Sequence, residues 1–175
     1  KPLSHDVYDG WKRVAGESIS NNGKWILYSA EPQEGDAHLV ILNSDSRSSD
    51  TIPRGVSGKF TEASDFAVFS IKPIFSEVKK LKIAKKKADD LPKDSLGIMR
   101  LATKVLAKVP RVKSFKLPEK GSGWLAYQLE KEPADTSKKG KKSAKKEDGA
   151  DADEDQADKK DEKGTTVRLR NLAAG

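Results

Sequence analysis

The chain has 175 residues, with 34 Lys and Arg against 27 Asp and Glu, and a formal net charge of +7. Only 35% of its residues are hydrophobic, a low share for a globular domain, and the length allows about one domain. No apolar run approaches the ~18–20 residues of a membrane-spanning helix, so we expect no membrane span. Because there is no cysteine, disulfides, thiolate zinc sites and cysteine nucleophiles are excluded.

Short apolar runs follow one another along the chain, each four to six residues long and most preceded by turn residues. In chain order they are Trp25–Tyr28, Leu39–Leu42, Phe66–Phe69, Leu96–Met99, Trp124–Tyr127 and Val167–Leu172. Their length and their β-branched and aromatic content predict strands. The earlier runs are apolar at consecutive positions, so we expect both faces of their sheets to be covered.

Two charged segments lie between these runs. Lys72–Lys93 holds eight Lys and three acidic residues, and a partial helical stripe within Ser76–Asp90 predicts a short helix there. We therefore expect a basic, partly helical insertion at residues 74–93. Residues 130–164 contain 10 Lys and 12 acidic residues but no large apolar residue. Such a segment cannot offset the entropy lost on ordering, so we predict a disordered charged insertion.

The spacing of the runs indicates a unit used three times. Leu39 precedes Phe69 by 30 residues and Leu96 precedes Tyr127 by 31, whereas the other intervals grow from 11 to 27 to 40. A unit of roughly 40 residues made of short antiparallel strands is typical of a propeller blade. We predict an all-β, partial β-propeller of about three four-stranded antiparallel blades, covering residues 11–55, 56–112 and 113–175, with insertions at one hairpin. The alternative is a β-sandwich with chance spacing.

Several motifs resemble those of a known family. Ser18–Ser29 is similar to the S-P-D-G-K-x-I-A-Y-S strand of bacterial propeller repeats, with Asn21-Asn22 in place of Pro-Asp. Leu96–Leu101 and Val167–Gly175 resemble the companion strand L-x-V-x-N-L-x-T-G. Together with the hairpin at Glu34-Gly35-Asp36, they resemble the N-terminal propeller of exported, dipeptidyl-peptidase-like serine peptidases of the prolyl-oligopeptidase family. Related repeats occur in Tol-system periplasmic proteins and in scaffolds.

This resemblance implies a non-catalytic cap that restricts the access of peptides to a C-terminal α/β-hydrolase domain of the same protein. It also implies a periplasmic or otherwise exported location, and residues 1–175 as the N-terminal part of a propeller domain. The Gly-x-Ser-x-Gly elbow that carries the nucleophile in such hydrolases is absent from this chain, since Gly55-Val56-Ser57-Gly58 has the wrong spacing. The alternative function is a propeller scaffold for protein interactions without peptidase activity.

No residue is predicted to be catalytic, to bind a cofactor or to ligate a metal. The two histidines, His5 and His38, are far apart in the sequence, and the acidic run Asp151–Asp155 lacks the spacing of a calcium loop. The lysines of Lys79–Lys87 have no interleaved aromatic residues, so we expect no nucleic-acid partner. The three tryptophans, Trp11, Trp25 and Trp124, are expected in the blade core rather than in a ligand groove.

Overall fold

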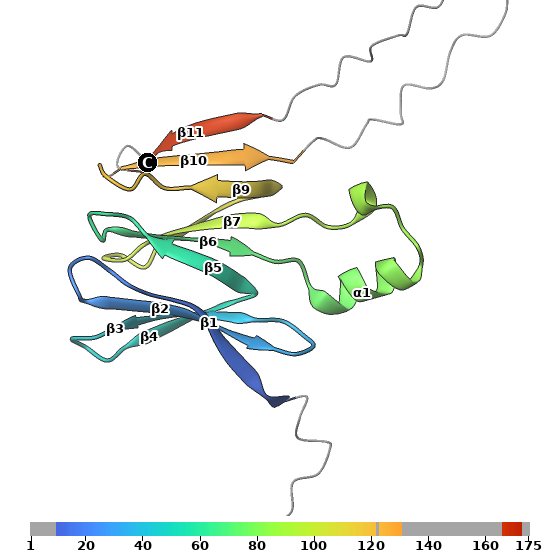
Figure 1. Cartoon of the computed structure of the whole chain (residues 1–175), viewed down its shortest axis with the longest axis horizontal. Helices are drawn as coiled ribbons and strands as arrows, with labels where there is room; N and C mark the ends of the chain where they lie inside the picture. The colour runs from blue at the N-terminus through green and yellow to red at the C-terminus, as the bar shows by residue number, and fades with distance from the viewer. Residues whose placement is uncertain (1–9, 122, 131–165, 173–175) are drawn as a thin grey trace, which may run out of the picture.

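The computed structural model describes residues 10–121, 123–130 and 166–172. Three antiparallel sheets follow one another along the chain and stack side by side (Figure 1). Sheet A has the order β1 (Lys12–Ile19), β2 (Trp25–Pro32), β3 (His38–Asn43) and β4 (Ser49–Pro53). Sheet B has the order β5 (Gly55–Phe60), β6 (Phe66–Ile71), β7 (Ser95–Arg100) and β8 (Leu106–Val109). Sheet C has the order β11 (Val167–Asn171), β10 (Trp124–Leu129) and β9 (Val112–Lys116).

This arrangement confirms the predicted all-β, partial propeller. In each sheet, consecutive strands pair as an antiparallel meander, which is how a propeller blade is built. Sheets A and B have four strands each, as expected, whereas sheet C has three among the residues that the structure describes.

The three sheets share the position of their second strands. Trp25, Phe66 and Trp124 each begin the second strand of a sheet. Just past each third strand, one backbone N–H donates to the carbonyl oxygen that precedes the second strand. These bonds run from Ser44 to Lys24 (2.8 Å), from Leu101 to Asp65 (2.9 Å) and from Leu172 to Gly123 (2.6 Å). The same closure therefore ends the central hairpin of every sheet.

Two apolar clusters hold the sheets together. The first joins sheet A to sheet B and comprises Leu27, Leu39, Ile41, Ile52, Ala67, Phe69, Ile71, Met99 and Leu101. The second joins sheet B to sheet C and comprises Val68, Leu96, Ile98, Val112, Leu125, Tyr127 and Leu172. Sheet B is thus apolar on both faces, as its consecutive apolar residues predict, and each fully buried Leu or Phe contributes about 1.5–3 kcal/mol.

Glycines on β5 allow sheets A and B to approach closely. A Cβ atom at Gly58 would lie 2.6 Å from Leu27 Cδ1, and one at Gly55 would lie 2.6 Å from Leu39 Cβ. A β-bulge lies between Val56 and Lys59, where Ser57 has a φ of 53°. The bulge turns both glycines toward sheet A.

The predicted helix is α1 (Phe75–Ile83), followed by a single 3-10 turn, η2 (Ala88–Asp90). Because α1 ends before Asp89 and Asp90, these carboxylates do not oppose its dipole. Among the described residues, neither helix is long and apolar enough to cross a membrane. The insertion predicted at residues 130–164 lies outside the described residues except for Glu130.

The prediction that the tryptophans are core residues is correct only for Trp25, which packs against the first cluster. Trp11 and Trp124 are 58% and 52% exposed, so for them it is wrong. Trp124 lies in the outermost sheet and Trp11 precedes β1, so neither residue lies between two sheets of the described part of the chain.

Candidate functional site

One end of the stacked sheets gathers the connections that carry the insertions. Strands of a meander alternate in direction, so the hairpin between the second and third strands lies at the same end as the link to the next sheet. In Figure 1 this end, here called the insertion end, holds the β2–β3 hairpin and the α1 segment, and residue 130 leaves β10 there. Binding residues concentrate on long loops, so within the described part of the chain this end is where we look for a functional site.

The links between sheets are two Pro-Arg pairs, which the sequence analysis missed. Arg54 and Arg111 follow Pro53 and Pro110, and both adopt the left-handed conformation, with φ of 62° and 59°. Each carbonyl oxygen accepts a hydrogen bond from the residue after a second strand, Lys72 in sheet B (2.8 Å) and Glu130 in sheet C (2.9 Å). The repeated Pro-Arg dipeptide, 57 residues apart, was the available signal.

Sheet A fixes the inserted helix. Asp36 Oδ1 accepts a hydrogen bond from the backbone N–H of Phe75 (2.8 Å), at the first residue of α1. Lys79 Nζ lies 2.8 Å from Glu34 Oε2, and Lys72 Nζ lies 2.6 Å from Asp94 Oδ2 at the base of the insertion. The residue before α1, Ile74, cannot cap the helix with its side chain, so Asp36 supplies an anionic cap from another sheet.

A cleft of about 400 Å³ opens between α1 and the β2–β3 hairpin. Its lining is mostly apolar and includes Phe75, Val78 and Leu91, together with the paired Asp36 and Asp94 and the exposed Lys82. These groups can bind an apolar or anionic side chain. They include no histidine, serine, threonine or cysteine, so the lining supplies neither a hydroxyl or thiol nucleophile nor an imidazole base.

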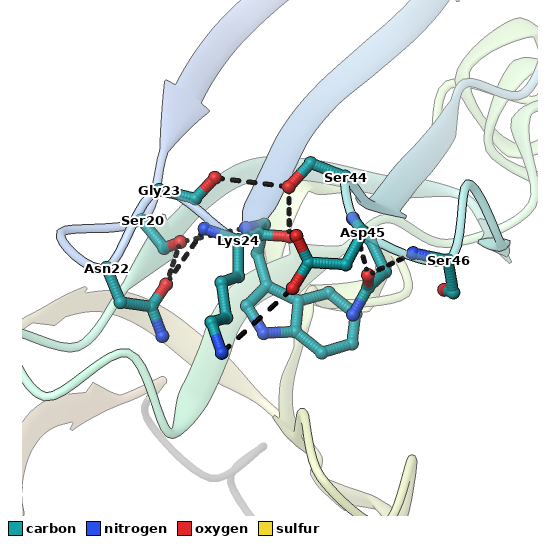
Figure 2. A network of polar contacts seen from close by, with 9 residues as sticks. Ser20, Asn22, Gly23, Lys24, Ser44, Asp45 and Ser46 are labelled. Atoms are coloured by element: carbon teal, nitrogen blue, oxygen red, sulfur yellow. Dashed lines mark hydrogen bonds and ion pairs between the residues drawn. The ribbon is translucent and has the colours of Figure 1, made fainter.

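The opposite end of the sheets is tied together by turns. In sheet A, Ser20 Oγ accepts from the Trp25 N–H (3.0 Å) and donates to Asn22 Oδ1 (2.7 Å), and Figure 2 shows this network beside Ser44 and Asp45. The turn then contacts the equivalent turn of sheet B, where Asn21 Nδ2 donates to the Glu62 carbonyl oxygen (3.0 Å) and the Asn22 N–H donates to Ser64 Oγ (3.2 Å).

Sheet C joins the same row of turns. The backbone N–H of Gly121, in the β9–β10 turn, donates to the Glu62 carboxylate. The turns between the first and second strands of all three sheets are therefore linked through Glu62 and its neighbours.

The structure brings none of the sequence candidates together into a catalytic arrangement. His38 begins β3, and its Nδ1 has no hydrogen-bond partner in the described part of the chain. Ser57 is exposed in the bulge of β5 and not on a strand-to-helix turn. No group of three His, Asp or Glu side chains that could hold a metal occurs among the described residues. His5 and Asp151–Asp155 lie outside them.

No protein-family model and no curated protein matches the sequence. Three solved structures are similar. The β-propeller domain of the Trilobed protease from Pyrococcus furiosus is 14% identical, with a TM-score of 0.48, over 68% of this chain and 35% of that chain. The acylaminoacyl peptidase of Pyrococcus horikoshii is 11% identical, with a TM-score of 0.48, over 73% of this chain and 19% of that chain. A prolyl endopeptidase is 17% identical, with a TM-score of 0.47, over 69% of this chain and 19% of that chain.

This chain therefore spans between 19% and 35% of the length of the solved chains that it matches. Its own sheets define its architecture. With two four-stranded meanders and one three-stranded meander stacked in chain order, the chain is a partial β-propeller.

Proposed function

We propose that this chain is a non-catalytic propeller segment of a serine peptidase, and that it limits the access of peptides to a hydrolase domain outside this chain. The observation that carries the proposal is the place of the residues that resemble peptidase propellers. Ser18–Ser29 spans the end of β1, the β1–β2 turn and the first half of β2. Ser20 and Asn22 close that turn, and Leu27 is fully buried between sheets A and B. The motif therefore builds part of the stacked sheets, which in this proposal form the wall that limits peptide access.

The mechanism is steric. Buried side chains on both faces of sheet B, and the linked turns at one end, make the stack stiff. A stiff wall admits extended peptides and excludes folded chains, because a folded protein can enter a narrow passage only after unfolding. The wall itself needs no acid, base or nucleophile.

The first experiment reads the coding sequence that follows the codon of Gly175. A Gly-x-Ser-x-Gly elbow followed by an Asp and a His supports the peptidase. Further blades followed by a stop codon would favour the interaction scaffold instead.

The helix α1 favours the scaffold function, because none of its residues is buried and a helix of this length needs packing against a partner to be stable.

The second experiment uses the chain itself. A fluorophosphonate probe labels activated serines, and we expect no labelling of the 175-residue chain and no hydrolysis of fluorogenic dipeptides. A Ser57→Ala variant is the matched control, because Ser57 is the serine nearest to an elbow motif. Labelling that disappears in Ser57→Ala would show that the chain is catalytic and would overturn the accessory role.

A further inference from the structure

One face of the inserted helix forms a wall of the cleft at the insertion end. Phe75, Val78 and Lys82 all line the cleft, and their spacing of three and then four residues places them on one side of α1. Leu91, from the segment that returns to sheet B, adds a further apolar side chain. The volume of about 400 Å³ is near the lower end of the range for ligand pockets, about 300–1,000 Å³.

The helix that forms this wall has little packing of its own. It lies to one side of the stacked sheets (Figure 1), none of its nine residues is buried, and Phe75 is 37% exposed. An isolated helix of this length is marginal in water, and the bonds that Asp36 and Glu34 make to it are polar. An apolar group in the cleft would cover Phe75 and Val78 and so supply the contact that α1 lacks.

The carboxylates around the cleft already have partners. Asp94 Oδ2 lies 2.6 Å from Lys72 Nζ. Glu34 Oε2 lies 2.8 Å from Lys79 Nζ, and Asp36 caps α1. The cleft therefore offers little attraction to a cationic ligand.

Several lysines, in contrast, have no such partner. Within the described part of the chain, no carboxylate forms an ion pair with Lys82 or with Lys85, Lys86 and Lys87, which follow α1 and are exposed. This uncompensated charge favours an anionic ligand. Because the lysines continue past the cleft, the ligand that fits them is an extended segment with several carboxylates rather than a single small anion.

The composition of this surface is that of an interface which forms and dissociates. The sheets of the chain meet through buried clusters without a charged residue, whereas the cleft carries lysines beside its apolar side chains. Permanent interfaces are the more hydrophobic kind, and exposed charges mainly raise the rate and the specificity of an encounter. The surface therefore suits a separate partner better than a permanently packed part of the same protein.

We propose that the cleft and Lys82, Lys85, Lys86 and Lys87 form a docking site for an acidic peptide segment of another protein. One apolar side chain enters the cleft, and the flanking carboxylates lie beside the lysines. Nucleic acid fits less well, because bases stack on aromatic side chains and Phe75 is the only aromatic residue of the lining. The acidic run of this chain, Asp151–Asp155, has no large apolar side chain to fill the cleft. The inference does not depend on the peptidase role.

The first test measures binding of a fluorescent peptide to the 175-residue chain by anisotropy. The probe has about ten residues, all glutamate except one central leucine, and we expect saturable binding at about 0.15 M salt. Replacing its leucine by serine, or its glutamates by glutamines, should each weaken binding about tenfold. No binding, equal binding of the serine peptide, or tighter binding of an oligouridylate of the same length would overturn the proposal.

Variants of the chain locate the site. Lys82→Glu should weaken binding about tenfold, because an attraction becomes a repulsion. Lys116→Glu is the matched control: it changes the net charge equally, but Lys116 ends β9 in sheet C, and charges are screened beyond ~8 Å at this salt concentration. Equal losses for the two variants would show that only the overall charge matters and would overturn the proposal.

The apolar part of the site has its own pair of variants. Val78→Ser should weaken binding about fivefold, because it removes part of the apolar wall. Ile83→Ser is the control on the same helix, since Ile83 is 74% exposed and does not line the cleft. Neither residue is buried, so both variants should fold, which thermal unfolding checks. Equal affinity of Val78→Ser and the unchanged chain would overturn the role of the cleft.

Hydrogen exchange gives a readout that does not depend on affinity. The Val78 N–H donates to the Ile74 carbonyl oxygen (3.1 Å) in the first turn of α1. At saturating peptide its exchange should slow about tenfold, because the ligand packs on a helix that is otherwise uncovered. The Ser44 amide, at the other end of sheet A, should exchange at the same rate with and without peptide. Unchanged exchange at Val78 in the complex would show that the peptide lies elsewhere and would overturn the proposal.

Discussion

Replacing Gly97 by alanine tests how tightly sheet B is packed. Gly97 pairs with Phe69 across β6 and β7, and a Cβ atom at this position would lie 2.7 Å from Phe69 Cζ. Phe69 is fully buried between sheets A and B, so its ring can move only by displacing other core residues. Overpacking of this kind costs about 1–3 kcal/mol, and the lower chain entropy of alanine offsets about 0.5–1 kcal/mol of it.

We therefore expect a net loss of about 1–2 kcal/mol in the free energy of unfolding, or ~2–8 °C in Tm for a chain of this length. Urea denaturation followed by far-UV circular dichroism measures it. Gly10→Ala is the control, because a Cβ atom there meets no heavy atom within 4 Å.

A double-mutant cycle separates this packing effect from a local effect on β7. Phe69→Leu alone should cost about 1–3 kcal/mol, because it removes buried carbon atoms. Combined with Gly97→Ala it should cost about 1 kcal/mol less than the sum, since the smaller side chain leaves room for the new methyl group. Strictly additive costs, or a neutral Gly97→Ala, would refute the packing argument.

Three further results are expected. Asp36→Ala should speed amide exchange in α1 about fivefold, because it removes the cap at Phe75, which is worth ~1 kcal/mol. The unfolding midpoint should stay unchanged, because α1 buries no residue. Asp45 lies at the other end of the sheets, and an equal effect of Asp45→Ala would contradict the capping role of Asp36. Ser20→Ala should lower the free energy of unfolding by about 1–2 kcal/mol, because it leaves the Trp25 N–H without its hydroxyl partner. Ser20→Thr should be tolerated, since sheet B has Thr61 at the equivalent position. Equal losses for the two variants in urea denaturation would contradict the role of the hydroxyl. Arg54→Val should be less stable than Arg54→Gly by about 1–2 kcal/mol in thermal unfolding, because φ is 62°; the reverse order would contradict the strain at this link.

The strands and their grouping could be predicted from the sequence because the signal is local. Runs such as Trp25–Tyr28 and Phe66–Phe69 combine β-forming residues with a preceding turn, and their spacing reveals the common hairpin. The helix was predictable for the same reason, from one apolar stripe next to lysines. The local pattern that predicts a strand does not say which strand of a sheet each run forms. The place of these runs as second strands is therefore known only from the strand pairing.

The contacts that assemble the site could not be predicted, because they join residues far apart in the sequence. Asp36 caps a helix that starts 39 residues later, and no pattern around Asp36 indicates it. The bulge at Ser57 and the left-handed links at Arg54 and Arg111 occur at residues that usually avoid positive φ. The tryptophan prediction failed at Trp124 because an aromatic residue on a sheet is buried only where another sheet covers that face.

Site-resolved hydrogen exchange of three amides tests most directly whether the three sheets are built alike. The N–H groups of Ser44, Leu101 and Leu172 lie just past the third strands and each closes the central hairpin of its sheet. We predict slow exchange at all three, well below the rate of an unstructured chain, with Leu101 at least as protected as the other two because sheet B is covered on both faces. Exchange of the Leu101 or Leu172 amide at the unstructured rate would contradict the stacked, equivalent sheets on which the proposed wall depends.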